Sequence, residues 1–180
     1  MVNIYKIRLT VLQQKILRLL FVKAGTSLNQ RQIANLLGVS QPAVMKSLPG
    51  MEGMVRSSQD KTTKRWSVEL NRDDHRAMQM KRADNLMLIY ETGLADFLER
   101  EFAGATLILF GSYSRGEDTM NSDVDVAVIG RKGKKTDLAA YERALERKIN
   151  LNFYDSLRSV HKNLRENLCN GIVISGGVEL

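Results

Sequence analysis

The feature that most constrains the fold of this chain is a short apolar segment, residues 106–110, that ends abruptly at Gly111-Ser112. Its composition, Thr-Leu-Ile-Leu-Phe, is typical of a strand buried on both faces. Glycine permits close approach of the backbone to a ligand, and a helix that begins at Ser112 would offer its free N–H groups to an anion. The Ser112 hydroxyl adds one more donor. The segment therefore predicts a strand, a phosphate-binding turn and a helix.

Two carboxylates follow after ten intervening residues, on a segment that alternates with period two from Asp123 to Ile129. In a strand, Asp123 and Asp125 project from one face about 7 Å apart, and the valines between and after them fill the other face. Two such carboxylates repel each other unless a cation lies between them, and Mg²⁺ prefers oxygen ligands. This pattern predicts a magnesium site able to activate a nucleophile and to stabilise departing pyrophosphate.

The spacing of Gly111-Ser112 and Asp123-Val124-Asp125 resembles the signature of the DNA polymerase beta-like nucleotidyltransferase superfamily, and most closely its minimal nucleotidyltransferase group. The resemblance implies that Ser112 contacts the β- and γ-phosphates of ATP or another nucleoside triphosphate and that Gly111 lets them approach. It also implies that Asp123 and Asp125 are catalytic and bind the metal. Arg115 either helps to neutralise the triphosphate or forms a surface ion pair with a neighbouring acid, Glu117 or Asp118.

The family expects a third carboxylate on the strand after the next helix, where it serves as metal ligand and general base. Here a helix over 137–148 leads into a strand over 149–154, and the residue that aligns with this acid is Asn150. An amide oxygen can bind a metal, but an amide carries no charge and accepts no proton at neutral pH. Asn150 is therefore a third catalytic candidate. The sequence leaves open whether the domain turns over as a Mg²⁺-dependent enzyme or binds a nucleotide with weak or no activity.

Residues 1–70 predict a winged helix DNA-binding domain. Apolar residues at helical spacing predict a helix over 9–20, Asn29 and Gln32 form a capping box for a second helix that ends at Gly38, and Ser40 begins a third. Two strands, 54–58 and 64–70, follow as a hairpin. In a winged helix, side chains of the third helix and of the hairpin would contact DNA, and here these are Gln41, Lys46, Arg56, Lys61, Lys64 and Arg65.

The charge distribution favours DNA binding over the alternative, a solvated basic face on three small helices. The net charge is +7, and residues 1–70 hold 11 Lys and Arg against 3 Asp and Glu, whereas residues 71–180 hold 16 against 17. The whole positive excess lies in the N-terminal part of the chain, where it would attract phosphates.

Residues 71–102 predict a connector of two helices broken near Thr92-Gly93, and residues 103–180 a minimal nucleotidyltransferase domain with a mixed sheet. The apolar stripe of the connector would face either the core or a second subunit of a homodimer. The C-terminal domain would close with a helix over 161–168 and a strand over 171–175. The fold class is thus α/β (α+β): a winged helix-turn-helix, a helical connector and a nucleotidyltransferase fold.

Two functions remain after these steps. The first is a nucleotidyltransferase that moves AMP from ATP to a hydroxyl acceptor. By resemblance, such proteins act as antitoxins that modify a toxin of the HEPN class, so the acceptor would be a protein. The second is a transcription regulator whose nucleotidyltransferase fold senses a nucleotide or a partner. A single cysteine, Cys169, excludes an internal disulfide, and the absence of a long apolar segment indicates a cytoplasmic protein without a membrane partner.

Overall fold

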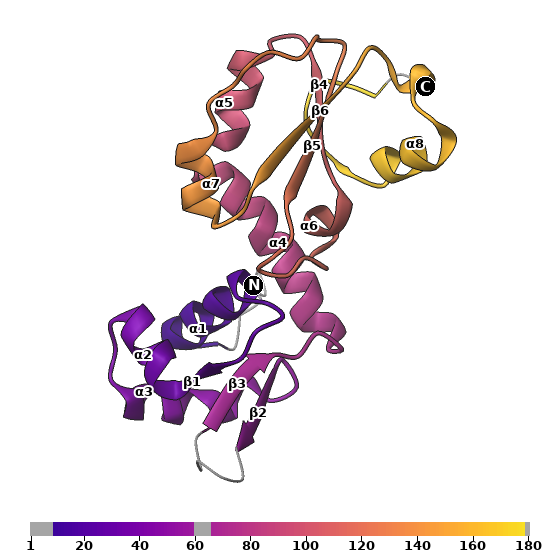
Figure 1. Ribbon diagram of the computed structural model, residues 1–180. Helices are drawn as coiled ribbons and strands as arrows, with labels where there is room; N and C mark the ends of the chain where they lie inside the picture. The colour runs from indigo at the N-terminus through magenta and orange to yellow at the C-terminus, as the bar shows by residue number, and fades with distance from the viewer. Residues whose placement is uncertain (1–8, 60–65, 179–180) are drawn as a thin grey trace, which may run out of the picture. The chain divides into compact units, whose positions relative to one another are not determined.

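The computed structural model describes residues 9–59 and 66–178 (Figure 1). By its contacts the chain divides into two compact units, Met1–Ala77 and Met78–Leu180. Each unit has its own sheet, of three strands in the first and of four in the second. In the part of the chain that is described, no helix is both long enough and apolar enough to cross a lipid bilayer.

The helices of the first unit begin where the sequence supplies side-chain caps. Thr10 and Gln13 form a capping box, Asn29 and Gln32 form a second one, and Ser40 accepts a hydrogen bond from the Ala43 N–H. The second helix ends at Gly38, whose φ of 64° suits glycine best. The resulting elements are α1 (Val11–Val22), α2 (Gln30–Leu37), α3 (Gln41–Ser47) and the 3₁₀ turn η1 (Leu48–Met51).

The sheet of the first unit is antiparallel, with strand order β1-β3-β2. Its strands are β1 (Leu28–Asn29), β2 (Val55–Gln59) and β3 (Trp66–Leu70). The predicted hairpin is confirmed, with Val55 opposite Leu70 and Gln59 opposite Trp66. The first unit thus has three helices followed by a hairpin, and strand β3 of the hairpin pairs with the short strand β1 before the second helix. This is the winged helix arrangement that the sequence predicts.

The second unit has a mixed sheet with strand order β6-β5-β4-β7. Strand β4 lies inside the sheet and is antiparallel to both neighbours, whereas β5 and β6 are parallel. The parallel pair needs a crossover, and a helix between the two strands provides it. The strands are β4 (Thr106–Phe110), β5 (Val124–Ile129), β6 (Ile149–Tyr154) and β7 (Ile172–Ser175).

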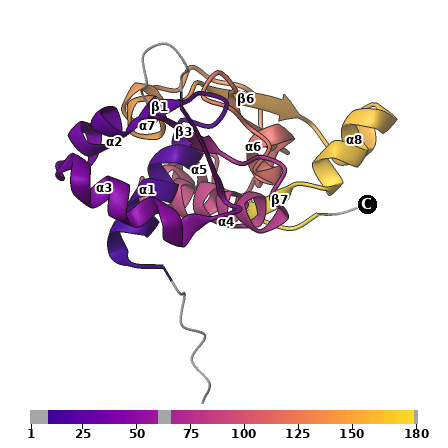
Figure 2. The same ribbon diagram turned by 90° about the horizontal axis from the view of Figure 1, so that it is seen from below.

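Helices cover both faces of this sheet. One face packs Leu107, Leu109 and Val126 against helices that precede β4 and against the crossover helix, while the other face packs Ile108 and Ala127 against the C-terminal helix. Figures 1 and 2 both show α8 apart from α5 and α7. The helical elements are α4 (His75–Glu91), α5 (Leu94–Glu101), α6 (Gly111–Arg115), α7 (Ala139–Leu145), η2 (Leu157–Ser159) and α8 (Lys162–Cys169).

The predicted break between the connector helices is confirmed, because Gly93 separates α4 from α5 with a φ of 75°. The apolar residues on both sides of it, Ile89, Leu94 and Leu98, are buried in the same cluster as β4 and β5. From Met78 onward, the segment predicted as a connector is therefore part of the second unit. Its apolar stripe is core, which was one of the two alternatives left open by the sequence.

Candidate active site

The candidate residues of the second unit meet at one end of the sheet. Strand β4 ends there at Phe110, and β5 and β6 begin there, because β5 runs antiparallel to β4 and parallel to β6. The register pairs Phe110 with Asp125, and Asp125 with Asn150. Three segments that are distant in the sequence thus bring Gly111, Asp125 and Asn150 together.

The two carboxylates share one hydrogen-bond donor. The Nδ2 of Asn150 donates to Asp123 Oδ2 at 3.1 Å and to Asp125 Oδ1 at 3.2 Å. Asp123 and Asn150 are exposed and Asp125 is half-buried, so the group faces solvent. Asn150 therefore occupies the position beside both acids at which the family resemblance expects a third carboxylate.

The backbone of Gly111 lies close to the Asp125 carboxylate. Its φ is 76°, and a Cβ atom at this position would lie 2.9 Å from Asp125 Oδ2. Both observations require glycine here, since other residues rarely adopt this φ and the added carbon would displace the carboxylate. The helix that follows begins at Gly111, one residue before the predicted start at Ser112, and the buried Ser114 holds this turn by donating its Oγ–H to the Gly111 carbonyl at 2.9 Å.

The two remaining phosphate-binding candidates lie on the same short helix, α6. Ser112 is half-buried in its first turn, next to Gly111. Arg115, at its end, is exposed and donates from Nε to Glu117 Oε2 at 2.8 Å. The ion pair with Glu117 that the sequence left as an alternative is thus present. Contact between Arg115 and a triphosphate stays a prediction.

Two residues of β6 share the face of Asn150: Asn152, which is polar and half-buried, and Tyr154, which packs against the apolar core. Asn152 donates from Nδ2 to the Asn150 carbonyl at 3.4 Å. Burial, and to a smaller extent the negative charge of Asp125, raise the pKa of the Tyr154 phenol. Asp155 follows at the other end of the strand, so it lies away from Asp123 and Asp125.

A hollow of about 500 Å³ opens beside Asp123. Its walls are the loop Met120–Ser122 and the crossover helix α7, from which Glu142 and Arg143 contribute side chains. Lys148, just before β6, completes the lining and lies 3.7 Å from Glu142 Oε2. Asp123 is therefore accessible from a space large enough for part of a second molecule.

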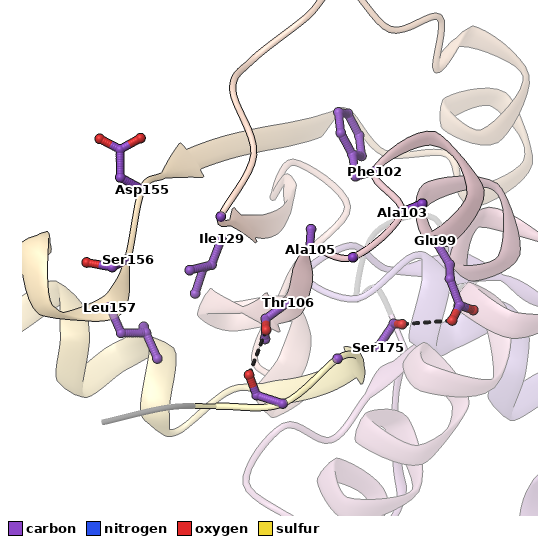
Figure 3. A pocket seen from close by; sticks show the side chains of 14 residues that line it. Glu99, Phe102, Ala103, Ala105, Thr106, Ile129, Asp155, Ser156, Leu157 and Ser175 are labelled. Carbon is purple, nitrogen blue, oxygen red and sulfur yellow. Dashed lines mark hydrogen bonds between the residues drawn. The ribbon is translucent and has the colours of Figure 1, made fainter.

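A larger cavity, of about 740 Å³, lies at the opposite end of the same sheet (Figure 3). It is lined by the first residues of β4 and by Ile129 at the end of β5, and two hydrogen bonds cross its wall, from Ser175 to Glu99 and from Thr106 to the Gly177 carbonyl. None of the residues predicted from the sequence to be catalytic lines it. If cavity volume alone decided where a ligand binds, the site would be placed here and not at Asp123 and Asp125.

Sequence reasoning missed a group of buried charges next to the site. Asp118, fully buried, accepts hydrogen bonds from Lys81 and Asn85 of α4 and from Arg147 before β6. Burial lowers the pKa of the Lys81 ammonium, and the Asp118 charge opposes this shift. A signal was present in the sequence, because Lys81 and Asn85 follow Ala77 at intervals of four residues and share its buried stripe on the helix.

In the first unit, Gln41 and Lys46 are exposed on α3, as expected for a helix that would contact DNA. Arg56 is exposed on β2 and forms an ion pair with Asp73. The other predicted contacts, Lys61, Lys64 and Arg65, lie outside the described residues. Met45 and Trp66, both exposed, line a hollow of about 470 Å³ between α3 and the hairpin.

Residues 92–173 match the model of a protein family described as nucleotidyltransferase domain. This range includes both acids and the amide of the site together with Gly111 and Ser112. The match confirms the resemblance seen in the sequence. No curated protein matches the chain.

Several solved structures resemble the chain distantly. The adhesin competence repressor of Streptococcus pyogenes is 22% identical, with a TM-score of 0.41 over 53% of this chain and 69% of its own. MepR of S. aureus, solved with DNA, is 21% identical, with a TM-score of 0.38 over 52% and 78%. The regulator BldR of Sulfolobus solfataricus is 18% identical, with a TM-score of 0.38 over 54% and 76%.

Proposed function

We propose that this chain, in which a winged helix domain is joined to a nucleotidyltransferase domain at residues 92–173, transfers a nucleoside monophosphate, AMP from ATP, to a hydroxyl group. One observation carries the proposal. Oxygens of Asp123 and Asp125 converge on a single point, which the Asn150 amide nitrogen occupies at 3.1 and 3.2 Å. A cation that displaced this amide could bind both oxygens if the two carboxylates moved closer, to the distance of about 2.0–2.1 Å that Mg²⁺ prefers.

The residues present are compatible with Mg²⁺. Carboxylate oxygens are the ligands it prefers, and it keeps several waters and substrate oxygens in its shell, so two protein acids are sufficient. Rotation of the Asn150 amide would present Oδ1 as a third, neutral ligand. Within residues 9–59 and 66–178, no group of three or more His, Cys, Asp or Glu side chains offers a competing metal site. When bound there, Mg²⁺ would neutralise part of the charge of the triphosphate.

The side chains of the site have separable roles in this proposal. Gly111 leaves room for the phosphates, and Ser112 donates its hydroxyl to them. The acceptor oxygen forms a bond to the α-phosphorus while the bond from that phosphorus to pyrophosphate breaks. The acceptor also loses a proton, and Asn150 cannot take it, since an amide is not a base at neutral pH. The proton would pass to water, so we expect slow turnover.

The hollow beside Asp123 supports an acceptor that approaches from the side of α7. Glu142, Arg143 and Lys148 place both signs of charge around it, which suits a polypeptide segment better than a polyanion. A protein acceptor is therefore part of the proposal. Its assignment to a HEPN-type toxin rests on the family resemblance alone.

DNA binding by the first unit is supported by charge and exposure. Its residues 1–70 carry the positive excess of the chain, and Lys46 and Gln41 are exposed on the helix that follows the short turn. We expect Lys46→Ala to weaken binding to all duplex sequences and to reduce the slope of affinity against salt by about 1, because one phosphate contact is lost. Lys15→Ala, on the exposed side of α1, is the matched control. An unchanged slope for Lys46→Ala would remove α3 from the DNA contact.

A second candidate function follows from Asn150 itself. With an amide in place of the general base, the domain could bind a nucleotide without transferring it and so act as a nucleotide-responsive DNA-binding regulator. The two candidates differ only in chemistry at the α-phosphorus. Both require a metal-bound nucleotide at Asp123 and Asp125.

One experiment separates them. Purified protein is incubated with α-labelled ATP and Mg²⁺, with and without cell lysate, as wild type, Asp123→Asn, Asn150→Asp and, as a matched control on α8, Asn167→Asp. Label transfer by the wild type that is lost in Asp123→Asn would support the transferase and point to its acceptor. Label transfer by Asn150→Asp alone would support the regulator. Transfer that survives Asp123→Asn would refute the site.

A further inference from the structure

Helix α4 holds the phosphate-binding helix α6 and the turn after it through buried polar side chains. Lys81 donates to Asp118 Oδ1, and Asn85 donates from Nδ2 to the same oxygen at 2.7 Å and to the Tyr113 carbonyl at 2.9 Å. Lys81 and Asp118 are fully buried, and Asn85 is 4% exposed. These bonds connect residues 28 to 37 positions apart in the sequence, so they fix tertiary rather than local structure.

The backbone of α4 also lies against α6 directly. Arg82 donates from Nε to the Ser114 carbonyl at 3.0 Å. At Gly116, which ends α6, a Cβ atom would lie 2.9 Å from the backbone nitrogen of Arg82. The short helix therefore cannot move relative to α4 without breaking these contacts.

Asp118 reaches a third segment through its second oxygen. Arg147, 6% exposed, donates from Nη2 to Asp118 Oδ2 at 3.4 Å. Arg147 comes three residues before Asn150, and Asp118 comes five residues before Asp123. One buried carboxylate thus joins the segment that carries Gly111 and Ser112, the segment that carries Asp123 and the segment that carries Asn150.

A buried charge is expensive to desolvate, and an apolar cluster of the same volume would stabilise a fold at least as well. We therefore expect the three buried charges of Lys81, Asp118 and Arg147 to serve a function other than stability. We propose that Asp118, held by Lys81, is the positioning residue of the nucleotide site: it sets the distance from the phosphate-binding turn at Gly111 to the group of Asp123 and Asn150. This inference rests on the proposed function, since it names what holds that site in shape.

The variants are chosen so that the domain still folds. Lys81→Met removes one cation and leaves Asp118 bonded to Asn85 and Arg147. Lys81→Gln keeps a neutral N–H donor on a side chain that is one bond shorter. Lys162→Met, on the exposed start of α8, makes the same change of charge and side chain away from the cluster. Circular dichroism and melting of each variant establish that it is folded.

The first measurement is the affinity for Mg²⁺ with a non-hydrolysable ATP analogue, by isothermal titration. We expect Lys81→Met to weaken binding about tenfold, Lys81→Gln to recover most of the loss because a donor to Asp118 is restored, and Lys162→Met to bind like the wild type. Equal affinity in wild type and Lys81→Met would overturn the inference, and so would a loss in Lys81→Met that Lys81→Gln does not recover.

The second measurement needs no nucleotide. The side-chain amide resonances of Asn150, assigned by their disappearance in Asn150→Asp, report the hydrogen bonds to Asp123 and Asp125. We expect them to shift or broaden in Lys81→Met and to return in Lys81→Gln. A wild type that binds no nucleotide refutes the proposed function, whereas Asn150 resonances that stay fixed in a folded Lys81→Met refute the positioning role. The two failures are therefore distinguishable.

Discussion

The second unit contains two groups of carboxylates that are five residues apart in sequence and opposite in character. Asp118 is fully buried and surrounded by Lys81, Arg147 and Asn85, whereas Asp123 is exposed and shares with Asp125 a single neutral donor. The protein neutralises the first group with its own cations. At the second group, within the part of the chain that the structure describes, the side-chain donor to both acids is the neutral amide of Asn150. The two groups thus differ in their donors: Asp118 has cationic side chains beside it, whereas Asp123 and Asp125, the proposed metal ligands, have a neutral amide.

The largest effect expected from this comparison is on stability, from Asp118→Asn. The substitution removes the buried negative charge that Lys81 and Arg147 share, so we expect the free energy of unfolding to fall by about 3–5 kcal/mol. Urea unfolding followed by circular dichroism measures it. Glu117→Gln breaks the neighbouring exposed ion pair with Arg115 and is expected to cost less than about 1 kcal/mol. Equal losses in the two variants would contradict the contrast.

Gly111→Ala is expected to have the next largest effect. A Cβ atom at a φ of 76° strains the backbone and presses on the Asp125 carboxylate, so we expect a loss of about 1–3 kcal/mol in unfolding free energy together with weaker Mg²⁺-nucleotide binding. Gly130→Ala, with a φ of 83° but no atom within 4 Å of the added carbon, isolates the backbone part of the loss. If both variants bind nucleotide like the wild type, the close approach of Gly111 to Asp125 is not part of the site.

Asp125→Asn is expected to change the free energy of unfolding little and to abolish binding of the Mg²⁺-nucleotide. Removing one of two neighbouring negative charges relieves repulsion, so without metal the unfolding free energy should stay within about 1 kcal/mol of the wild type. Mg²⁺-nucleotide binding, measured by isothermal titration, should be lost. Asp155→Asn, at the other end of β6, is the control that should bind normally. Retained binding in Asp125→Asn would place the nucleotide elsewhere.

The smallest effect is a pH dependence carried by Lys81. Because burial lowers its pKa below the ordinary value of 10.5, the folded protein holds fewer protons at Lys81 than the unfolded chain as the pH approaches that value. Proton linkage then adds to the unfolding free energy as the pH rises through this window. The unfolding free energy of the wild type minus that of Lys81→Met should therefore increase as the pH rises toward 10.5. A constant difference would mean that Lys81 titrates normally.

The features predicted correctly from the sequence are those encoded locally. The capping box of Asn29 and Gln32 needs only four consecutive residues, and the alternation after Asp123 needs only one strand. Asn150 was chosen by alignment with the third acid of the family, and the register of β6 against β5 then places it opposite Asp125.

Features that depend on distant partners could not be predicted from local patterns alone: the spacing of Lys81 and Asn85 along α4 is a signal, but it does not name their partner. The bonds of Asp118 to Lys81 and Arg147 span 37 and 29 positions, and nothing in the neighbourhood of Asp118 distinguishes it from the exposed Glu117. Strand β1 has two residues, too few for an alternation to be seen, and it exists because β3 pairs with it. The crossover helix begins at Ala139 rather than Asp137, whose carboxylate instead accepts a hydrogen bond from the Ala139 N–H.

The pairing of Asn150 with Asp125 has a consequence for the evolution of such a site. Aspartate and asparagine have nearly the same shape, and their codons differ at a single base. Because the strand register already places residue 150 beside both acids, one point mutation would exchange an amide for an acid without any change in backbone, packing or chain length. Proteins with this fold could therefore lose and regain a carboxylate at this position repeatedly in evolution. Two homologues, one with the carboxylate and one with the amide, would then differ at this site by one nucleotide.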